Sequence, residues 1–267
     1  MTPEQALSLS ARFAAVSILL SSLEYFSNIR VLRDDGLMSW AVGRLRVPTF
    51  SVGWRGAMFD VLLRYPNMLV LLALRVGLSA AIVAGPARWT LAPLILLGLY
   101  AVTFLVNVRS RYGHDGADQL AGFVMLGIGV SSLVPTSLSR AACLFFFAFQ
   151  SCLAYGTAGW CKLPMRGWRD GTYLAAVLTA RIYGMPPLGR FLSAHPVYAK
   201  LASRGLLAWE CSFPLVLILP APIAFGMVGL GVVFHLVNAY VMGLNCFVWS
   251  FVATYPPLLW TVQKRGW

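Results

Sequence analysis

Long apolar runs separated by shorter polar segments dominate the pattern of this chain. A helix needs about 20 predominantly apolar residues to cross a bilayer, and by that criterion the pattern predicts about eight transmembrane or half-inserted helices. Their expected ranges are 8–29, 66–85, 89–108, 118–135, 141–161, 206–220, 222–242 and 245–262. The sixth and the eighth are short or interrupted by proline. We therefore expect an all-α polytopic membrane protein, a helix bundle formed by a single domain over residues 1–267.

Two further stretches suggest interfacial helices. The apolar patch at 171–183 has the length of a surface or half-inserted helix. The long connection 30–64 alternates arginines with tryptophan and phenylalanine, a mixture typical of segments in the headgroup region. It could equally cover the opening of a cavity, and the sequence does not decide between these two interpretations.

Composition and charge agree with a membrane location. Hydrophobic residues make up 59% of the chain and charged residues 11%, against about 45–50% and 25% in soluble domains. The net charge is +12, but the basic residues lie between the apolar runs, where they orient spans and contact anionic lipid. No basic patch stands apart from the spans, so we expect membrane lipid and not nucleic acid as a partner. The predicted location is the cell membrane, multi-pass, which is the cytoplasmic membrane if the source is bacterial.

The cysteines and histidines give no sign of a metal site. The five cysteines all lie in or beside apolar segments and form no CxxC pair, so we interpret them as small buried hydrophobes. The three histidines have no zinc-binding spacing. We expect no bound metal.

Ionisable residues inside the predicted spans are candidates for a functional site. A charged side chain at the centre of a membrane helix costs about 2.5–3.5 kcal/mol on insertion scales. Glu24, Arg75, Glu210 and His235 fall in such positions, and Asn238 follows His235 by one turn on the same face. The structural alternatives are that Glu24 pairs with an arginine, either Arg30 or Arg75, that Glu210 is paired or protonated, and that His235 bonds a neighbouring helix.

Lys162 ends the apolar run at 141–161 and is one of three lysines in the chain. Tyr155 lies above it on the helix, and Trp160 and Trp168 flank it. One interpretation is an anchor that reaches the membrane surface. The other is a general base, which requires that desolvation or nearby positive charge lower the pKa of a lysine.

The stretch RSRYGHDGADQLAG, residues 109–122, precedes the fourth predicted span. Asp115 or Gly116 can cap that helix, and Asp118 in its first turn favours the positive end of the helix dipole. Capping does not explain His114, which is either a loop histidine or a proton carrier.

Four segments resemble a known family. YGHDGADQL (112–120), AGWCKLPMRGWRDGTYL (158–174), AWECSFPLVL (208–217) and FHLVNAYVMGL (234–244) occur in that order. Together they resemble the HTTM family, the transmembrane domain shared with vitamin K-dependent gamma-glutamyl carboxylase. The resemblance covers most of the chain after about residue 100, and AG-x-x-KL-x-x-x-x-W is its most specific element.

The resemblance implies a chemistry for these residues. In the carboxylase a lysine deprotonates vitamin K hydroquinone, the anion reacts with oxygen, and the resulting base removes a glutamate γ proton before carbon dioxide is captured. Lys162 matches that lysine, although Cys161 replaces the lysine before it in the family. His114 resembles the histidine near the reacting oxygens. The implied cofactor is a reduced quinone of the vitamin K or menaquinol type. The implied substrate- or quinol-binding residues are Tyr155, Trp160, Glu210, His235, Asn238 and Asp118.

The chain departs from the carboxylase in having no large domain after its last predicted span, which argues against carboxylation of a propeptide-bearing client. Two functions therefore remain. One is a quinol-dependent, carboxylase-like enzyme of the oxygenase or lyase type that modifies a small peptide or another substrate. The other is a non-catalytic accessory, maturation or export factor for a secreted peptide. The enzyme predicts that Lys162 and His114 converge on an enclosed apolar pocket, and the accessory factor predicts that Lys162 points to the headgroups.

Overall fold

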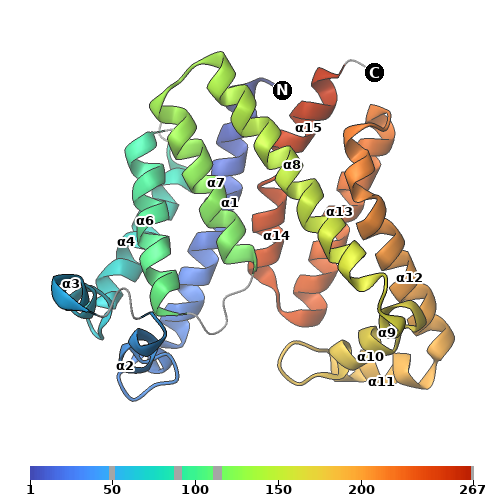
Figure 1. The fold of residues 1–267 in the computed structure, drawn as a ribbon, viewed down its shortest axis with the longest axis horizontal. Coiled ribbons are helices and arrows are strands. Elements are labelled where there is room, and N and C mark those ends of the chain that lie inside the picture. Colours follow the sequence, from blue (N-terminus) through green and yellow to red (C-terminus); the bar gives the residue numbers. More distant parts are fainter. Residues whose placement is uncertain (48–51, 87–91, 111–115, 266–267) are drawn as a thin grey trace. The chain divides into compact units, whose positions relative to one another are not determined.

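The computed structural model describes residues 1–47, 52–86, 92–110 and 116–265, and every regular element in these ranges is a helix (Figure 1). The chain divides into two compact units. We call residues Glu4–Cys143 the N-terminal unit, and Met1–Pro3 together with Leu144–Trp267 the C-terminal unit. The described part of the chain is therefore all-α, as the pattern predicts.

In the N-terminal unit, the apolar helices α4, α6 and α7 pack side by side in the order of the chain. Helix α6 packs against both α4 and α7. The helices of this unit are α1 (Pro3–Ser27), η1 (Ile29–Leu32), α2 (Trp40–Gly43), η2 (Arg44–Arg46), α3 (Gly53–Leu63), α4 (Met68–Ala84), α6 (Pro93–Arg109), α7 (Gly116–Leu133) and the first residues of α8 (Ser137–Lys162).

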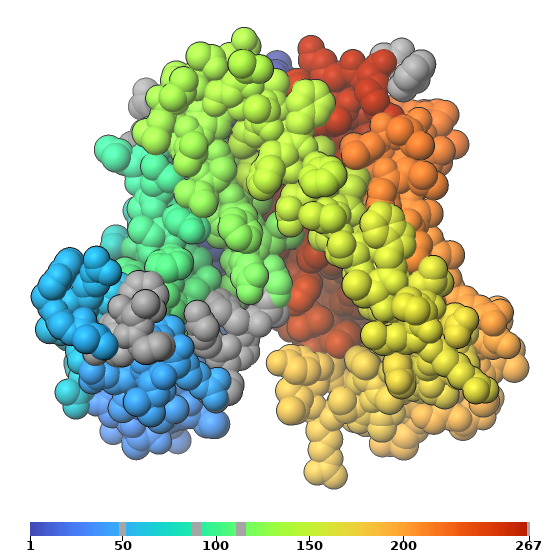
Figure 2. Space-filling model, in the orientation of Figure 1, coloured from blue at the N-terminus to red at the C-terminus, as the bar shows by residue number. Residues whose placement is uncertain are grey.

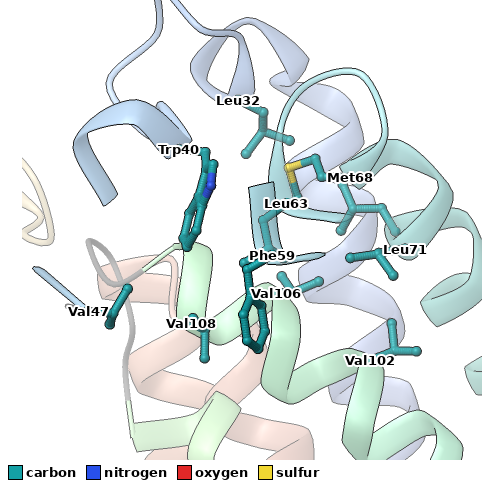
Figure 3. Packing of buried hydrophobic residues seen from close by; sticks show 11 residues of the cluster. Leu32, Trp40, Val47, Phe59, Leu63, Met68, Leu71, Val102, Val106 and Val108 are labelled. Carbon is teal, nitrogen blue, oxygen red and sulfur yellow. The ribbon is translucent and has the colours of Figure 1, made fainter. Parts of the chain in front are cut away.

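The described part of the connection 30–64 folds onto a hydrophobic core of the N-terminal unit. Figure 3 shows Trp40 and Phe59 from this connection in one cluster with valines of α6. The buried Arg109 at the end of α6 fixes the arrangement, because its guanidinium donates to the carbonyl groups of Leu63 (2.7 Å) and Leu32. The basic and aromatic composition of this segment thus serves packing within the unit as well as its surface.

The C-terminal unit is built around the second part of α8 and the long helix α13. A buried cluster joins α8, α12, η4, α13 and α15, with Tyr155, Trp209 and Phe213 among its members. The remaining helices are α9 (Arg166–Asp170), α10 (Thr172–Thr179), α11 (Pro186–Ala194), α12 (Pro196–Ser212), η4 (Phe213–Leu217), α13 (Ala221–Met242), α14 (Asn245–Val252) and α15 (Tyr255–Lys264).

Among the described residues, four helices are long and apolar enough to cross a membrane, namely α1, α7, α8 and α13. The bent pair α3 and α4, which meet at 69°, raises this number to five if it forms one span. Helix α6 is apolar but shorter. The phenylalanines at 145, 146 and 149 on α8 are exposed. Figure 2 shows atoms of α8, coloured yellow-green to yellow, on the near face. Such an apolar surface is compatible with contact to hydrocarbon.

Two predicted spans are not single helices. The segment expected at 206–220 is the end of α12 followed by η4, which contains Pro214. The segment expected at 245–262 is broken between α14 and α15, just before Pro256 and Pro257. Proline removes a backbone donor and clashes with the preceding turn, which explains both breaks. Because four or five spans among the described residues qualify by length and composition, the expected number of eight stays a prediction. The patch at 171–183 contains the short helix α10.

Candidate functional site

The segment 158–174, which contains Lys162, forms a tight junction with α12 where α8 ends. A Cβ atom at Gly159 would lie 2.7 Å from the backbone nitrogen of Cys211, so the two helices touch at this point. Gly171 has a φ of 87° and its Cβ would lie 2.3 Å from the carbonyl carbon of Ala199, a position that only glycine fills without strain. The motif glycines are therefore required by close packing of the backbone, as small residues are at helix crossings in membranes.

The turn between α9 and α10 is closed by its own polar groups. The backbone N–H of Thr172 donates to Asp170 Oδ1 at 3.0 Å, and the Thr172 hydroxyl donates to the same oxygen at 2.7 Å. These bonds hold the pKa of the Asp170 carboxyl below its ordinary value. Ser203 of α12 donates to the carbonyl group of Trp168, which ties α9 to α12.

This packing brings Lys162 and Glu210 together. Lys162 Nζ donates to both carboxylate oxygens of Glu210, at 2.6 Å and 2.8 Å. The Glu210 side chain is 4% exposed and that of Lys162 is 25% exposed. The ammonium also lies 5.1 Å from the centre of the Trp168 ring, within the range of a cation–π contact. Lys162 therefore is not a free anchor at the end of α8, because its charge is directed back onto a buried carboxylate.

The Lys162–Glu210 pair joins two helices, and a proton can also move between its two groups. Transfer of one proton from Nζ to Glu210 converts the ionic pair into an amine and a carboxylic acid, with no change in total charge. The neutral amine is the form of Lys162 that can act as a base.

A second polar group in the same unit consists of Tyr155, His235 and Tyr255. The Tyr155 hydroxyl lies 2.5 Å from Nε2 of His235 and 2.6 Å from the Tyr255 hydroxyl. All three side chains are at most 3% exposed. A Cβ at Gly231 would lie 2.5 Å from the Tyr255 hydroxyl, so the absence of a side chain there makes room for this contact.

Aromatic rings enclose this hydrogen-bonded group. Tyr155 contacts Trp209 and Phe213, with ring centroids 4.9 Å and 4.1 Å away. His235 stacks on Phe251, with centroids 4.2 Å apart and planes at 24°. Trp209, whose ring contacts Tyr155, is followed in the chain by Glu210.

Two buried nitrogen atoms at this site lack a partner. Nε1 of Trp209 and Nδ1 of His235 make no hydrogen bond with any residue that the structure describes. A buried polar group without a partner costs about 1–3 kcal/mol. Both atoms thus keep an unused capacity to form a hydrogen bond.

The other predicted site residues divide between the two units. Trp160 is 51% exposed on α8, and it is Trp168 whose ring lies near the ammonium. Asn238 is half-buried on α13, one turn after His235. Asp118 lies on α7 of the N-terminal unit, where it pairs with Arg75 at 3.4 Å. His114 lies outside the described residues.

Sequence reasoning missed Tyr255 and Phe251. Neither is charged, and both lie in an apolar run that was interpreted as a span. Tyr255 could have been identified from its hydroxyl group in an apolar run next to two prolines. A buried tyrosine hydroxyl usually has a hydrogen-bond partner, so it points to another polar side chain nearby. Among the described residues, no group of three or more histidine, cysteine, aspartate or glutamate side chains could hold a metal ion.

Comparison with known proteins adds no assignment. No family model matches the chain, and no curated protein or solved structure matches it.

Proposed function

We propose that this chain is an integral membrane enzyme related in chemistry to the vitamin K-dependent carboxylase, with Lys162 as the base that deprotonates a quinol. The observation that carries the proposal is the contact of Lys162 Nζ with both oxygens of the buried Glu210. A lysine at this position is also what the resemblance to the HTTM motifs implies. The substrate modified with the help of the quinol would be a small peptide or another molecule.

The residues at this site fit a quinol by their hydrogen-bonding capacity. The indole N–H of Trp209 can donate to a quinol oxygen, and Nδ1 of His235 can exchange a hydrogen bond with a hydroxyl group. The rings of Phe213 and Phe251 supply apolar surface for a planar molecule. A bound quinol would supply an acidic hydroxyl and two reducing electrons.

The protein's own part in this chemistry is the movement of one proton. Lys162 first passes a proton to Glu210, and the neutral amine then accepts the proton of the quinol hydroxyl at Nζ. Glu210 thus positions the lysine and serves as its proton acceptor. The hydrogen bonds among Tyr155, His235 and Tyr255 hold the neighbouring rings in place, and the buried surroundings limit competition by water.

A second function is favoured by the same contact. Both oxygens of Glu210 are engaged by Lys162, and an ion pair of this kind can simply clamp α8 to α12. In that case the chain is a non-catalytic accessory, maturation or export factor for a secreted peptide. The two functions differ in whether the lysine must lose its proton.

The test is quinol oxidation by the purified full-length protein, followed by the absorbance of the quinone product under oxygen. Lys162→Arg is the decisive variant, because arginine keeps the ion pair with Glu210 but does not give up its proton. We expect it to lower the rate by about 100-fold or more, the usual contribution of a general base. Lys200→Arg is the matched control, since Lys200 is exposed on α12, and its rate should equal that of the unmodified protein.

Two results would count against the enzyme. An unchanged rate in Lys162→Arg would remove the lysine from the chemistry. A protein that oxidises no quinol at all, while remaining folded, would favour the accessory function.

A further inference from the structure

A pocket between α6 and α7 lies in the N-terminal unit, which does not contain Lys162. Its volume is about 520 Å³, within the range of small-molecule sites. An inference about this pocket goes beyond the proposed function and does not depend on it.

The lining of the pocket changes from aromatic to polar along the helices. Tyr100 and Phe104 of α6 and Phe123 of α7 form its aromatic part. Asn107 lies two residues before the end of α6, and Gln119 lies in the first turn of α7. Tyr100 and Asn107 are separated by about 10 Å along the helix axis. The pocket therefore suits a molecule with an apolar ring at one end and a polar group at the other.

The charge in the polar part is already balanced. Asp118 lines the pocket, and its carboxylate lies 3.4 Å from Nη2 of Arg75. The Arg75 side chain is fully buried and also donates to the hydroxyl of Thr103 at 3.3 Å. A cationic ligand would be repelled by the Arg75 guanidinium, and an anionic ligand by the Asp118 carboxylate. The arrangement favours a ligand without net charge.

The hydrogen-bonding groups that line the pocket limit the class of ligand further. A carboxylate offers about four acceptor sites and no donor, so Asp118 can accept from a ligand hydroxyl while Arg75 stays in place. The side-chain amides of Asn107 and Gln119 each have N–H groups, and the oxygen of the ligand hydroxyl can accept a hydrogen bond from them. A hydroxyl group satisfies both kinds of partner, whereas an ether or a carbonyl group satisfies only the amides.

We propose that the α6–α7 pocket binds a neutral, ring-containing amphipathic molecule whose hydroxyl group donates to Asp118. The hydroxyl oxygen accepts from Asn107 or Gln119, and the ring packs against Tyr100, Phe104 and Phe123. Phenol-type lipids and other hydroxylated aromatic amphiphiles, quinols among them, belong to this class.

Two glycines provide matched variants for a test. A Cβ at Gly122, which lines the pocket, would meet only the Tyr100 ring, at 3.8 Å. A leucine there adds a branched side chain to the lining of the pocket. Gly77 on α4 has no atom within 4 Å of its Cβ position, so Gly77→Leu adds the same side chain to a helix of the same unit outside the pocket.

The experiment is equilibrium dialysis of the full-length protein in detergent against three naphthalene probes. 1-Naphthol is neutral and carries a donor, 1-methoxynaphthalene has nearly the same shape without the donor, and 1-naphthylmethylamine is a cation at neutral pH. We expect 1-naphthol to bind the unmodified protein and Gly77→Leu equally, and to bind Gly122→Leu at least about tenfold more weakly. The methoxy and cationic probes should each bind about tenfold more weakly than 1-naphthol, because neither satisfies Asp118 without a new cost.

Asn107→Leu gives an independent measurement if the glycine variant is poorly folded. It removes one amide partner at a half-buried position, and we expect 1-naphthol to bind several-fold more weakly. Equal 1-naphthol binding by the unmodified protein, Gly122→Leu and Asn107→Leu would overturn the assignment of the pocket. Equal binding of 1-naphthol and 1-methoxynaphthalene would overturn the role of the hydroxyl, and failure of 1-naphthol to bind would overturn the proposal as a whole. Quinol oxidation is measured separately with Lys162→Arg, so failure of the pocket proposal and failure of the proposed function are distinguishable.

Discussion

Replacing Lys162 by methionine removes the partner of a carboxylate that is 4% exposed in the C-terminal unit. Methionine keeps a long unbranched stem, so the change removes charge and little volume. At the observed separation, two unit charges attract by about 6 kcal/mol if the effective dielectric constant is about 20. The cost of desolvating both groups offsets most of this attraction.

The expected loss is set by the carboxylate that remains. Breaking a fully buried pair costs about 3–5 kcal/mol. Because Lys162 is 25% exposed, water can reach part of the vacated site, and we expect about 2–3 kcal/mol for Lys162→Met by comparison with that range. Glu210→Gln should cost less, since the lysine that it leaves unpaired can turn towards solvent. The combination of both substitutions should fall within about 1 kcal/mol of the unmodified protein, because no unpaired charge remains.

The assay is a double-mutant cycle on the folded protein in one detergent. Thermal unfolding is followed by tryptophan fluorescence at a fixed heating rate, since the apparent midpoint depends on that rate when unfolding is irreversible. A loss of 2–3 kcal/mol corresponds to a midpoint lower by about 5–10 °C in a chain of this size. If the two single substitutions simply add in the double variant, the groups are not energetically coupled and the reasoning is refuted.

Two further predictions test packing, one in each unit. Gly231→Ala should lower stability by about 1–3 kcal/mol, because its methyl group would displace the Tyr255 hydroxyl at 2.5 Å. Gly229→Ala on the same helix meets no atom within 4 Å and should raise stability by up to about 1 kcal/mol; equal unfolding midpoints for these two variants would contradict the packing. Arg12 donates to two carbonyl groups at the end of α4, at 2.9 and 2.8 Å, so Arg12→Ala should cost about 1–3 kcal/mol and Arg12→Lys less. Equal midpoints for Arg12→Ala and the unmodified protein would show that these bonds contribute nothing.

The sequence predicted best the helices that are encoded by one continuous apolar run. The runs that became α1, α7, α8 and α13 combine length with continuous apolar character, and hydrocarbon-compatible length is a property of the run itself. The runs at 206–220 and 245–262 were equally apolar but contain proline, and where such a run breaks depends on which backbone carbonyls find other partners. At the end of η4 that partner is Arg265, which donates to the carbonyl groups of Val216 and Leu219.

The candidate site was predicted as a set of residues but not as a set of contacts. Lys162 and Glu210 were both chosen because a charge near hydrocarbon needs a reason, yet nothing in the pattern paired them across 48 positions. The structure pairs Arg75 of α4 with Asp118 of α7 at 3.4 Å, a contact that the sequence did not suggest. The sequence by itself therefore determined the helical class, the apolar character of the long helices and the identity of the unusual polar residues, because these depend on composition and on neighbours along the chain.

Tertiary structure decided everything that depends on two helices meeting. The missing side chain at Gly159 lets α12 approach α8 closely enough for Glu210 to meet Lys162, and that at Gly231 admits the Tyr255 hydroxyl. A side chain that must be absent leaves no periodic signal in a single sequence. Contacts between residues far apart in the chain are fixed by the packing of whole helices, and only the folded arrangement shows which polar groups share a buried site.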